Sequence, residues 1–508
     1  MDLHEGGHSL PPGFRGKLRP FRGGLAQSMA NATAYQNGEK SLFGHPRGLT
    51  YLFTTEMWER FSYYGMRAIL VLYLTNYLLL EPTASNVIGY HTLKRFFESM
   101  TGPLDVQPFS SMIYGTYTAF VYLTPFFGGI IADRWIGQRY AVIIGGIIMA
   151  AGEFVLMVPQ FLFLGLGLLI IGNGFFKPNI STQVGNLYQP GDSRIDRAYS
   201  IFYVGINVGA FFSPLICGSL GETVGYQWGF FAAGIGMVIG QLIYVFALRT
   251  LPPDRVARLK THTEEKKPLT RQDWKAIFAI ILLCIPVTFF WATYEQQGNT
   301  INLWAQNFTN RELIPGLIDW EIPVTWFQAF NPFMIAAFTP LIVSLWGRQS
   351  KKGTEPSTVT KMALGLFLLA ISYLVMALAA HLAPQGGASW LWLALFFAFI
   401  TLGELYLSPI GLALVARVAP AQILSMMMGL WFITSFTGNL LQGYIGSFFS
   451  QMDKVSFFLM CSAIGAVAGV LTWLFNFPLR PILEAKPAAD AAAAAAAAAA
   501  ANARGAEA

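Results

Sequence analysis

Charged residues are scarce in this chain of 508 residues, because Asp, Glu, Lys and Arg make up only 12% of it. Soluble domains contain about 25% of these residues. Hydrophobic residues account for 54% of the chain and aromatic residues for 15%. This balance is typical of an all-α polytopic membrane protein. The net charge of +6 is modest and follows from membrane topology alone, so no nucleic-acid partner is expected.

Cysteine and histidine are also rare. Cys217, Cys284 and Cys461 lie in apolar segments without a CxxC pair, so we interpret them as small buried hydrophobic residues. No metal site and no cofactor are expected. The chain has no HExxH or GxSxG motif, so it is not expected to be an enzyme. No histidine lies inside an apolar segment, so protons that cross the membrane would have to be carried by carboxylates.

Twelve apolar stretches are long enough to cross a bilayer as helices, which takes about 20 residues. They are expected near 48–80, 109–132, 139–158, 160–182, 198–218, 226–248, 274–300, 322–346, 358–381, 388–414, 422–449 and 455–478. A charged loop divides them into six plus six, which is the layout of a secondary transporter. The expected parts are a flexible arm (1–47), a six-helix bundle (48–248), a linker (249–273), a second bundle (274–480) and a low-complexity tail (481–508).

Basic residues indicate how the chain is oriented. The loops on the side of the two termini hold most of the loop Lys and Arg residues, whereas the opposite loops hold only Lys94, Arg95, Arg311 and Lys454. By the positive-inside rule, both termini are expected in the cytoplasm, in agreement with an even number of spans. The predicted location is the cell inner membrane, with lipid around the spans.

The first span contains a polar stripe within the sequence EMWERFSYYG and just beyond it. At 100° per residue, one face of the helix carries Glu56, Glu59, Arg60, Tyr63 and Arg67. Each charge in a span costs about 2.5–3.5 kcal/mol at the helix centre, so such residues face a water-filled path or one another. A buried carboxylate next to an arginine can exchange a proton, because desolvation raises its pKa and the cation lowers it.

Arg67 of this stripe and three charges in other spans form two poles. Lys177 and Arg67 are positive, and Glu295 and Glu404 are negative. These poles suit a zwitterion, and two extended residues span at most about 7 Å. Glu153 has no evident partner and is interpreted as structural. Nearby polar and aromatic candidates are Tyr64, Tyr122, Asn207, Trp291, Gln296, Gln297, Asn331 and Trp431.

EMWERFSYYG fits the ExxERFxYYG motif of the proton-dependent oligopeptide transporter family, within the major facilitator superfamily. The chain resembles bacterial members of that family over residues 48–480. Further stretches that match in the same order are FFKPNISTQVGNLY, SIFYVGINVGAFFSPLI, FFWATYEQQGN and LGELYLSPIGLALVARVAP. A loop pattern shared across the superfamily, GxxxDRxxGxR, is formed by Gly129, Asp133, Arg134, Gly137 and Arg139.

The resemblance implies the fold of that superfamily and the import of di- and tripeptides with protons by alternating access. It implies proton coupling by Glu56, Glu59 and Arg60, together with Glu295. It further implies a gate formed by Lys177 and Glu404, which also grip the peptide, and a gate formed by Arg67 and Glu295 on the opposite side. The implied lining of the pocket is Tyr63, Tyr64, Tyr122, Asn207, Trp291, Asn331 and Trp431.

Two departures from the family pattern and two alternatives remain. Residues 249–273 are too few for the extra helix pair that many bacterial members carry, and Gly115 stands where animal members have a functional His. Another solute (an amino-acid derivative, a peptidomimetic or an anion) stays open as a substrate. A second alternative is that the protein is a nutrient sensor and does not transport a solute. The acids of the first span and Glu404 favour peptide, because a site for a bare anion needs less negative charge.

Overall fold

The computed structural model describes residues 44–189, 192–252, 254 and 269–506. The chain divides into Met1–Arg47 and Gly48–Ala508, and the fold below is that of the second unit. Most of the predicted flexible arm (1–47) and the middle of the predicted linker (249–273) lie outside the described residues.

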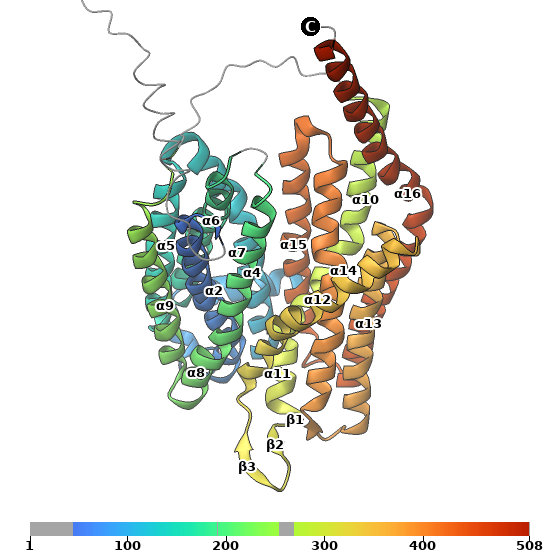
Figure 1. The fold of residues 1–508 in the computed structure, drawn as a ribbon. Coiled ribbons are helices and arrows are strands. Elements are labelled where there is room, and N and C mark those ends of the chain that lie inside the picture. Colours follow the sequence, from blue (N-terminus) through green and yellow to red (C-terminus); the bar gives the residue numbers. More distant parts are fainter. Residues whose placement is uncertain (1–43, 190–191, 253, 255–268, 507–508) are drawn as a thin grey trace, which may run out of the picture. The chain divides into compact units, whose positions relative to one another are not determined.

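The first bundle consists of helices joined by short turns (Figure 1). Its helices are α2 (Arg47–Tyr73), α3 (Tyr90–Thr101), α4 (Val106–Ile131), α5 (Gln138–Leu156), α6 (Leu162–Asn186), α7 (Ile195–Ser213), α8 (Ser219–Thr223) and α9 (Tyr226–Ala247). Short π-helical segments prolong three of them, at Leu74–Leu78, Ala132–Ile136 and Pro214–Gly218. The spans match the expected positions, whereas the surface helix α3 was not predicted.

The second bundle contains helices and short strands. Its helices are α10 (Arg271–Tyr294), α11 (Thr300–Asn307), α12 (Phe330–Lys351), α13 (Thr358–Leu382), α14 (Leu391–Val418), α15 (Leu424–Ser447) and α16 (Lys454–Ala506). Its strands are β1 (Thr309–Asn310), β2 (Glu312–Ile314), β3 (Ile318–Glu321) and β4 (Ala388–Ser389); β2 and β3 form an antiparallel hairpin, and β1 pairs with β4 in parallel. The helix α16 continues through the alanine-rich tail, in accordance with the high helix propensity of alanine.

Nine helical segments of the described chain are long and apolar enough to cross a membrane. Three others, α2, α4 and α15, have 27, 26 and 24 residues, which is long enough, and they lie at the positions of the remaining predicted spans. Of these three, α2 carries charges, and α4 and α15 carry hydroxyl and amide groups. Many of those polar side chains are buried, including Arg60, Ser111 and Asn439. Their polar faces therefore point into the protein.

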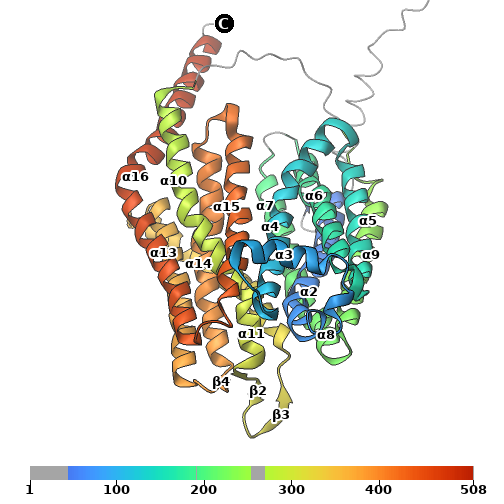
Figure 2. The same cartoon turned by 180° about the vertical axis from the view of Figure 1, so that it is seen from behind.

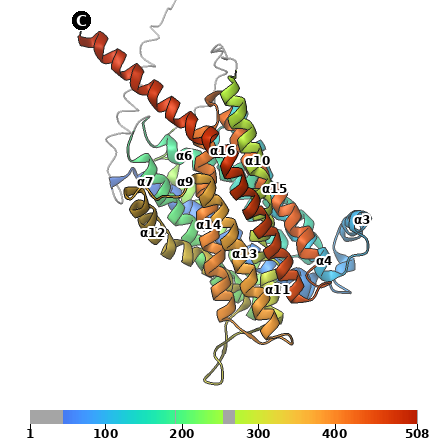
Figure 3. The same ribbon diagram turned by 90° about the vertical axis from the view of Figure 1, so that its right-hand side faces the viewer.

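The two bundles meet along α4 and α15 and along α7 and α12 (Figures 1 and 2). We call the end with β2 and β3 the hairpin end, and the opposite end, where α9 finishes and α10 begins, the linker end (Figure 3). Near the hairpin end α4 and α15 approach closely, because a methyl group on Gly115 would lie 2.5 Å from the Cα of Gly443. Two glycines thus allow this contact.

Candidate functional site

The acidic motif of α2 folds into one buried ion cluster. The guanidinium of Arg60 donates two hydrogen bonds to Glu59, one of them from Nη2 to Oε1 at 2.5 Å. Its Nε lies 3.4 Å from Oε1 of Glu56. The three side chains are at most 4% exposed, and Oε2 of Glu56 has no hydrogen-bond partner among the described residues. One cation therefore faces two carboxylates, and a carboxylate oxygen of Glu56 is left over for a proton.

Further contacts of Arg60 connect the ion cluster to neighbouring helices. Nη2 lies 3.5 Å from Oδ1 of Asn173 on α6, and the amide nitrogen of Asn173 donates to the carbonyl oxygen of Val121 on α4 at 2.8 Å. The guanidinium also lies over the rings of Tyr63 and Tyr64, at 5.0 and 6.0 Å from their centroids. The ion cluster is thereby in contact with two candidate pocket residues.

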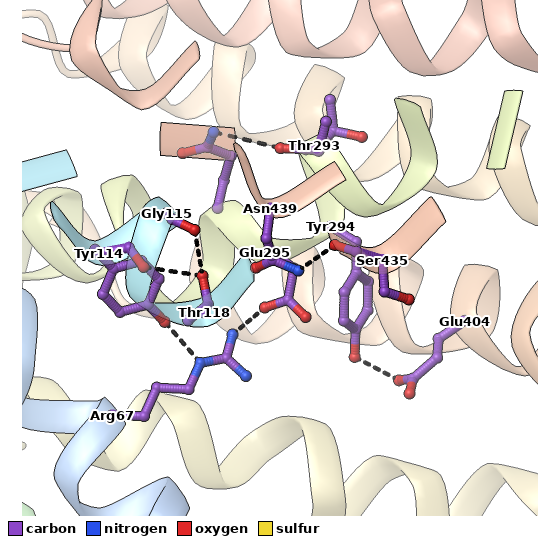
Figure 4. Close-up of polar contacts among 12 residues, drawn as sticks. Arg67, Tyr114, Gly115, Thr118, Thr293, Tyr294, Glu295, Glu404, Ser435 and Asn439 are labelled. Carbon is purple, nitrogen blue, oxygen red and sulfur yellow. Dashed lines mark hydrogen bonds and ion pairs between the residues drawn. The ribbon is translucent and has the colours of Figure 1, made fainter. Parts of the chain in front are cut away.

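A second ion pair joins the two bundles. Nη2 of Arg67 on α2 donates to Glu295, which lies in the turn after α10, and Nε of Arg67 donates to the hydroxyl of Tyr114 at 2.6 Å (Figure 4). The side chains of Arg67 and Glu295 are 7% and 2% exposed. An ion pair this deeply buried is costly to break, because each partner would leave the other charge uncompensated.

Glu404 of α14 lies beside this ion pair. Its Oε2 accepts a hydrogen bond from the hydroxyl of Tyr294 at 2.7 Å and one from Nδ2 of Asn331 at 3.0 Å. Asn331 also lies 3.0 Å from the hydroxyl of Thr401. Because Tyr294 precedes Glu295 in the chain, one backbone segment contacts both Arg67 and Glu404 (Figure 4). Two neutral donors orient the carboxylate of Glu404 without neutralising it.

The predicted pair of Lys177 and Glu404 is not formed in this structure, since the ion pairs between described residues do not include it. The ammonium of Lys177 instead lies 5.0 Å from the ring centroid of Tyr122. Both Lys177 and Glu404 are half-buried. Lys177 and Glu404 are thus free of each other, while Arg67 and Glu295 are paired.

Hydrogen bonds between the bundles occur at one end. Within the described part of the chain, all hydrogen bonds between the two bundles lie toward the hairpin end. They include those of Gln107 with Gly446, Ser111 with Asn299, Glu222 with Thr325, and Asn302 with Ala68. The ion pair of Arg67 and Glu295 belongs to the same region. The bundles are therefore fastened at the hairpin end, and the described residues show no comparable hydrogen bonds between them at the linker end.

Other predicted pocket residues make mostly local contacts. The side chain of Asn207 donates to the carbonyl oxygen of Tyr203 in its own helix, at 2.9 Å. Trp291 stacks edge-on against Tyr294, and its indole nitrogen is buried without a partner in the described chain. Trp431 is 5% exposed and contacts Gly411, where a methyl group would lie 2.2 Å from the indole ring. Of these three, only Trp291 contacts a residue that holds Glu404.

Several contact residues were not predicted from the sequence. Tyr114 accepts a hydrogen bond from Arg67, and Tyr294 donates one to Glu404. In the sequence, each is only a tyrosine within a span that stands next to a residue already singled out, Gly115 or Glu295. Glu153, for which no partner was evident, accepts a hydrogen bond from Ser62 at 3.2 Å and is fully buried. No group of three or more metal-ligating side chains occurs in the described part of the chain.

The loop pattern between α4 and α5 forms a turn at the linker end. Gly137 has φ = 82°, a backbone conformation that favours glycine. The backbone N–H of Arg139 donates to Oδ2 of Asp254 at 3.0 Å, and its guanidinium donates to the carbonyl oxygen of Leu251. Asp254, which was not predicted, thus connects this turn to the segment after α9. Asp133 and Arg134 are exposed, and Gly129 lies near Pro178.

Comparisons with known proteins agree with this arrangement. The model of the POT family matches residues 139–255 and 254–467. The peptide transporter YePEPT of Yersinia enterocolitica is 32% identical over 88% of this chain and 97% of its own length. A di-/tripeptide transporter of Lactococcus lactis is 33% identical over 88% of this chain and 98% of its own length.

Solved structures give the same result. A crystal structure of the peptide transporter POT in complex with sulfate has a TM-score of 0.75 and 28% identity, and covers 89% of this chain and 98% of that one. A POT family transporter in complex with 5-aminolevulinic acid has a TM-score of 0.74 and 27% identity, and covers 87% of this chain and 98% of that one.

Proposed function

The chain belongs to the POT family, and we propose that it imports di- and tripeptides together with protons by alternating access. The observation that carries this proposal is the likeness, over 88% of the chain, to two proteins named as peptide transporters. The chain is a multi-pass membrane transporter and not an enzyme. We place both termini in the cytoplasm of the inner membrane, since the basic loops lie on their side. The linker end then faces the cytoplasm.

The binding step uses the two poles. We propose that the ammonium group of a peptide binds near Glu404, and that its carboxylate binds near Lys177 and Arg67. The support is that Glu404 is oriented by Tyr294 and Asn331 but is not neutralised by either. Hydrogen bonds to charged groups contribute about 1.5–3 kcal/mol each, so the two termini can supply much of the binding energy. Side chains of many kinds are then acceptable.

The proton step uses the ion cluster of α2. Because Arg60 faces both Glu56 and Glu59, we propose that the pair of acids shares one transported proton. Both carboxylates contact the same guanidinium, so we assign the proton to the pair and not to either acid alone. Protonation removes one negative charge next to Arg60, which frees its guanidinium to change partners. Glu295 is proposed to release Arg67 in the same way when the hairpin end opens.

The cycle follows from which gate is closed. Arg67 and Glu295 are paired and Lys177 and Glu404 are apart, which supports our proposal that this is the state open toward the linker end. We propose that pairing of Lys177 with Glu404 closes the linker end when the hairpin end opens. The Asp254 contact joins the start of the linker to the turn between α4 and α5 of the first bundle, and it is expected to move with that bundle.

The proposal is tested by uptake of labelled dialanine into proteoliposomes with and without an inward proton gradient. Accumulation that requires the gradient and is inhibited by excess tripeptide is the expected result. Absence of uptake in both conditions, with protein shown to be folded, would reject peptide as the substrate.

An amino-acid derivative is a second candidate substrate. The specific observation in its favour is the similar POT family transporter solved with 5-aminolevulinic acid, a molecule that also carries an amino group and a carboxyl group. Inhibition of dialanine uptake by 5-aminolevulinic acid, followed by uptake of the labelled compound, would establish it.

A further inference from the structure

A polar cavity opens at the linker end of the second bundle, away from the site described above. Its volume is about 400 Å³, and it is lined by Glu355, Thr358, Lys361, Arg417, Arg480 and Leu483, among others. These residues come from the segment before α13, from the first turn of α13, from the end of α14 and from α16. The cavity is large enough for a phosphate group, and three of its lining side chains are cations.

The walls of the cavity are held in place by side-chain hydrogen bonds. Nη2 of Arg417 donates to the hydroxyl of Thr358 at 3.1 Å, which joins α14 to α13. The hydroxyl of Ser357 donates to Oδ1 of Asn476 at 2.7 Å, which joins α13 to α16. The cavity is therefore formed before any ligand binds, and all of its walls belong to one bundle.

The charge in the cavity is positive. Lys361 pairs with Glu355, and this hydrogen bond lowers the pKa of the Glu355 carboxyl group. The ammonium of Lys361 also lies 4.3 Å from the ring centroid of Trp346. The carboxylate that lines the cavity is thus engaged by Lys361, whereas Arg417 donates to an uncharged hydroxyl. Guanidinium groups are well suited to phosphate, which they can bind with two parallel hydrogen bonds.

An apolar stripe on α16 leads along the helix to Arg480, which lines the cavity. Trp473 and Phe477 lie seven and three residues before Arg480, so all three share one face of the helix. Trp473 and Phe477 are 46% and 63% exposed, and the centroids of their rings lie 5.2 Å apart. Exposed aromatic rings followed by an arginine near the end of an apolar helix are typical of helices that contact lipid.

We propose that this cavity binds the phosphate group of an anionic lipid, with the lipid chains along Trp473 and Phe477. Arg417 and Arg480 contact the phosphate, and the polar lining accommodates the remainder of the headgroup. Because all of the walls come from one bundle, the lipid stays bound while the bundles move. Its affinity is therefore expected to be the same with and without a transported peptide.

The test measures binding of pyrene-labelled phosphatidylglycerol to the purified full-length transporter in detergent, by energy transfer from tryptophan. Arg417→Gln and Arg480→Gln should each weaken binding about fivefold, since each basic residue near an anionic lipid surface contributes about that factor. Binding of pyrene-labelled phosphatidylcholine should not change in either variant. Arg348→Gln is the matched control, because Arg348 is an exposed arginine at the end of α12 that does not line the cavity.

The outcomes are distinguishable. Loss of affinity in Arg480→Gln alone still supports the site if Arg417→Gln proves to be unfolded in a thermal melt. Equal losses in Arg348→Gln, or unchanged affinity in both folded cavity variants, would overturn the proposal. Displacement of the labelled lipid by millimolar inorganic phosphate would assign the cavity to a free anion and reject lipid as its source. A change in affinity on adding dialanine would contradict the one-bundle argument.

Discussion

At the residue scale, the ion cluster of α2 is the most informative feature. One guanidinium faces two carboxylates that are almost completely buried. Burial of an uncompensated carboxylate costs far more free energy than burial of its protonated form. The arrangement therefore favours one proton on the pair of Glu56 and Glu59, provided that Arg60 keeps the other acid ionised. This makes the pair suitable for carrying a proton in step with movements of Arg60.

Neutral substitutions test this idea. Glu56→Gln or Glu59→Gln should abolish accumulation driven by a proton gradient but preserve exchange of labelled for unlabelled dialanine, because the amide cannot release a proton. Both activities are measured in the same proteoliposomes. Full accumulation in both variants would show that the proton is carried elsewhere. Glu153→Gln is a useful comparison, because Glu153 is equally buried but contacts Ser62 and not Arg60.

A second residue-scale prediction concerns the peptide terminus. Glu404→Gln should weaken binding of dialanine roughly 10- to 100-fold, since a charged hydrogen bond contributes about 1.5–3 kcal/mol. N-acetyl-dialanine lacks the ammonium group, so its affinity should change little. Competition against a labelled dipeptide measures both affinities. Equal losses for the two ligands would mean that Glu404 does not contact the amino terminus.

At the element scale, α2, α4 and α15 direct polar side chains into the interior of the protein. The residues concerned are charged in α2, whereas α4 and α15 carry hydroxyl and amide groups. They supply Arg60, Arg67, Tyr114 and Ser111 to contacts within or between the bundles. Polar residues are tolerated there because they satisfy one another away from lipid.

The contact of α4 with α15 gives an element-scale prediction. In Gly115→Ala the added methyl group would lie 2.5 Å from the Cα of Gly443, and backbone cannot move aside as a flexible side chain can. We expect the hairpin end to open, with a longer distance between spin labels on the exposed residues Ser85 and Gln451. Gly167→Ala is the control, because its methyl group would meet nothing within 4 Å. An unchanged distance in Gly115→Ala would contradict the packing argument.

At the scale of the whole molecule, the bundles are fastened at the hairpin end and must separate there to admit a peptide. The contacts to be broken include the buried pair of Arg67 and Glu295 and the hydrogen bonds of Gln107. Such contacts are favourable only when they form together. The molecule is therefore expected to have two discrete states, because packed interfaces do not deform continuously.

A cross-link tests this two-state description. Gln107 and Ser450 lie on different bundles, and the side chain of Gln107 accepts a hydrogen bond from the backbone N–H of Ser450 at 3.0 Å. The variant combines Gln107→Cys with Ser450→Cys. Joining them with a short reducible cross-linker should stop dialanine uptake, and reductant should restore it. Asn76→Cys with Tyr226→Cys is the control, because these hydrogen-bonded residues lie within the first bundle. Uptake that persists in the cross-linked Gln107 and Ser450 pair would show that the hairpin end need not open.

The family and the all-helical transporter fold followed from the sequence and are confirmed by the comparisons. Helix ends were less certain. The span expected at 322–346 begins as α12 only at Phe330, since a tighter 3₁₀ turn occupies Val324–Ala329. The roles of the individual site residues stay predictions.

The sequence by itself determined which charges are buried, because a charge inside an apolar span has to face the protein interior. It also determined that Glu56, Glu59 and Arg60 share one helix face, since helical periodicity is a local property. Only the tertiary structure decided that Tyr114 holds Arg67, that Tyr294 holds Glu404 and that Arg67 pairs with Glu295. These contacts join residues far apart in the chain and depend on how the two bundles are packed, which periodicity within a helix does not specify.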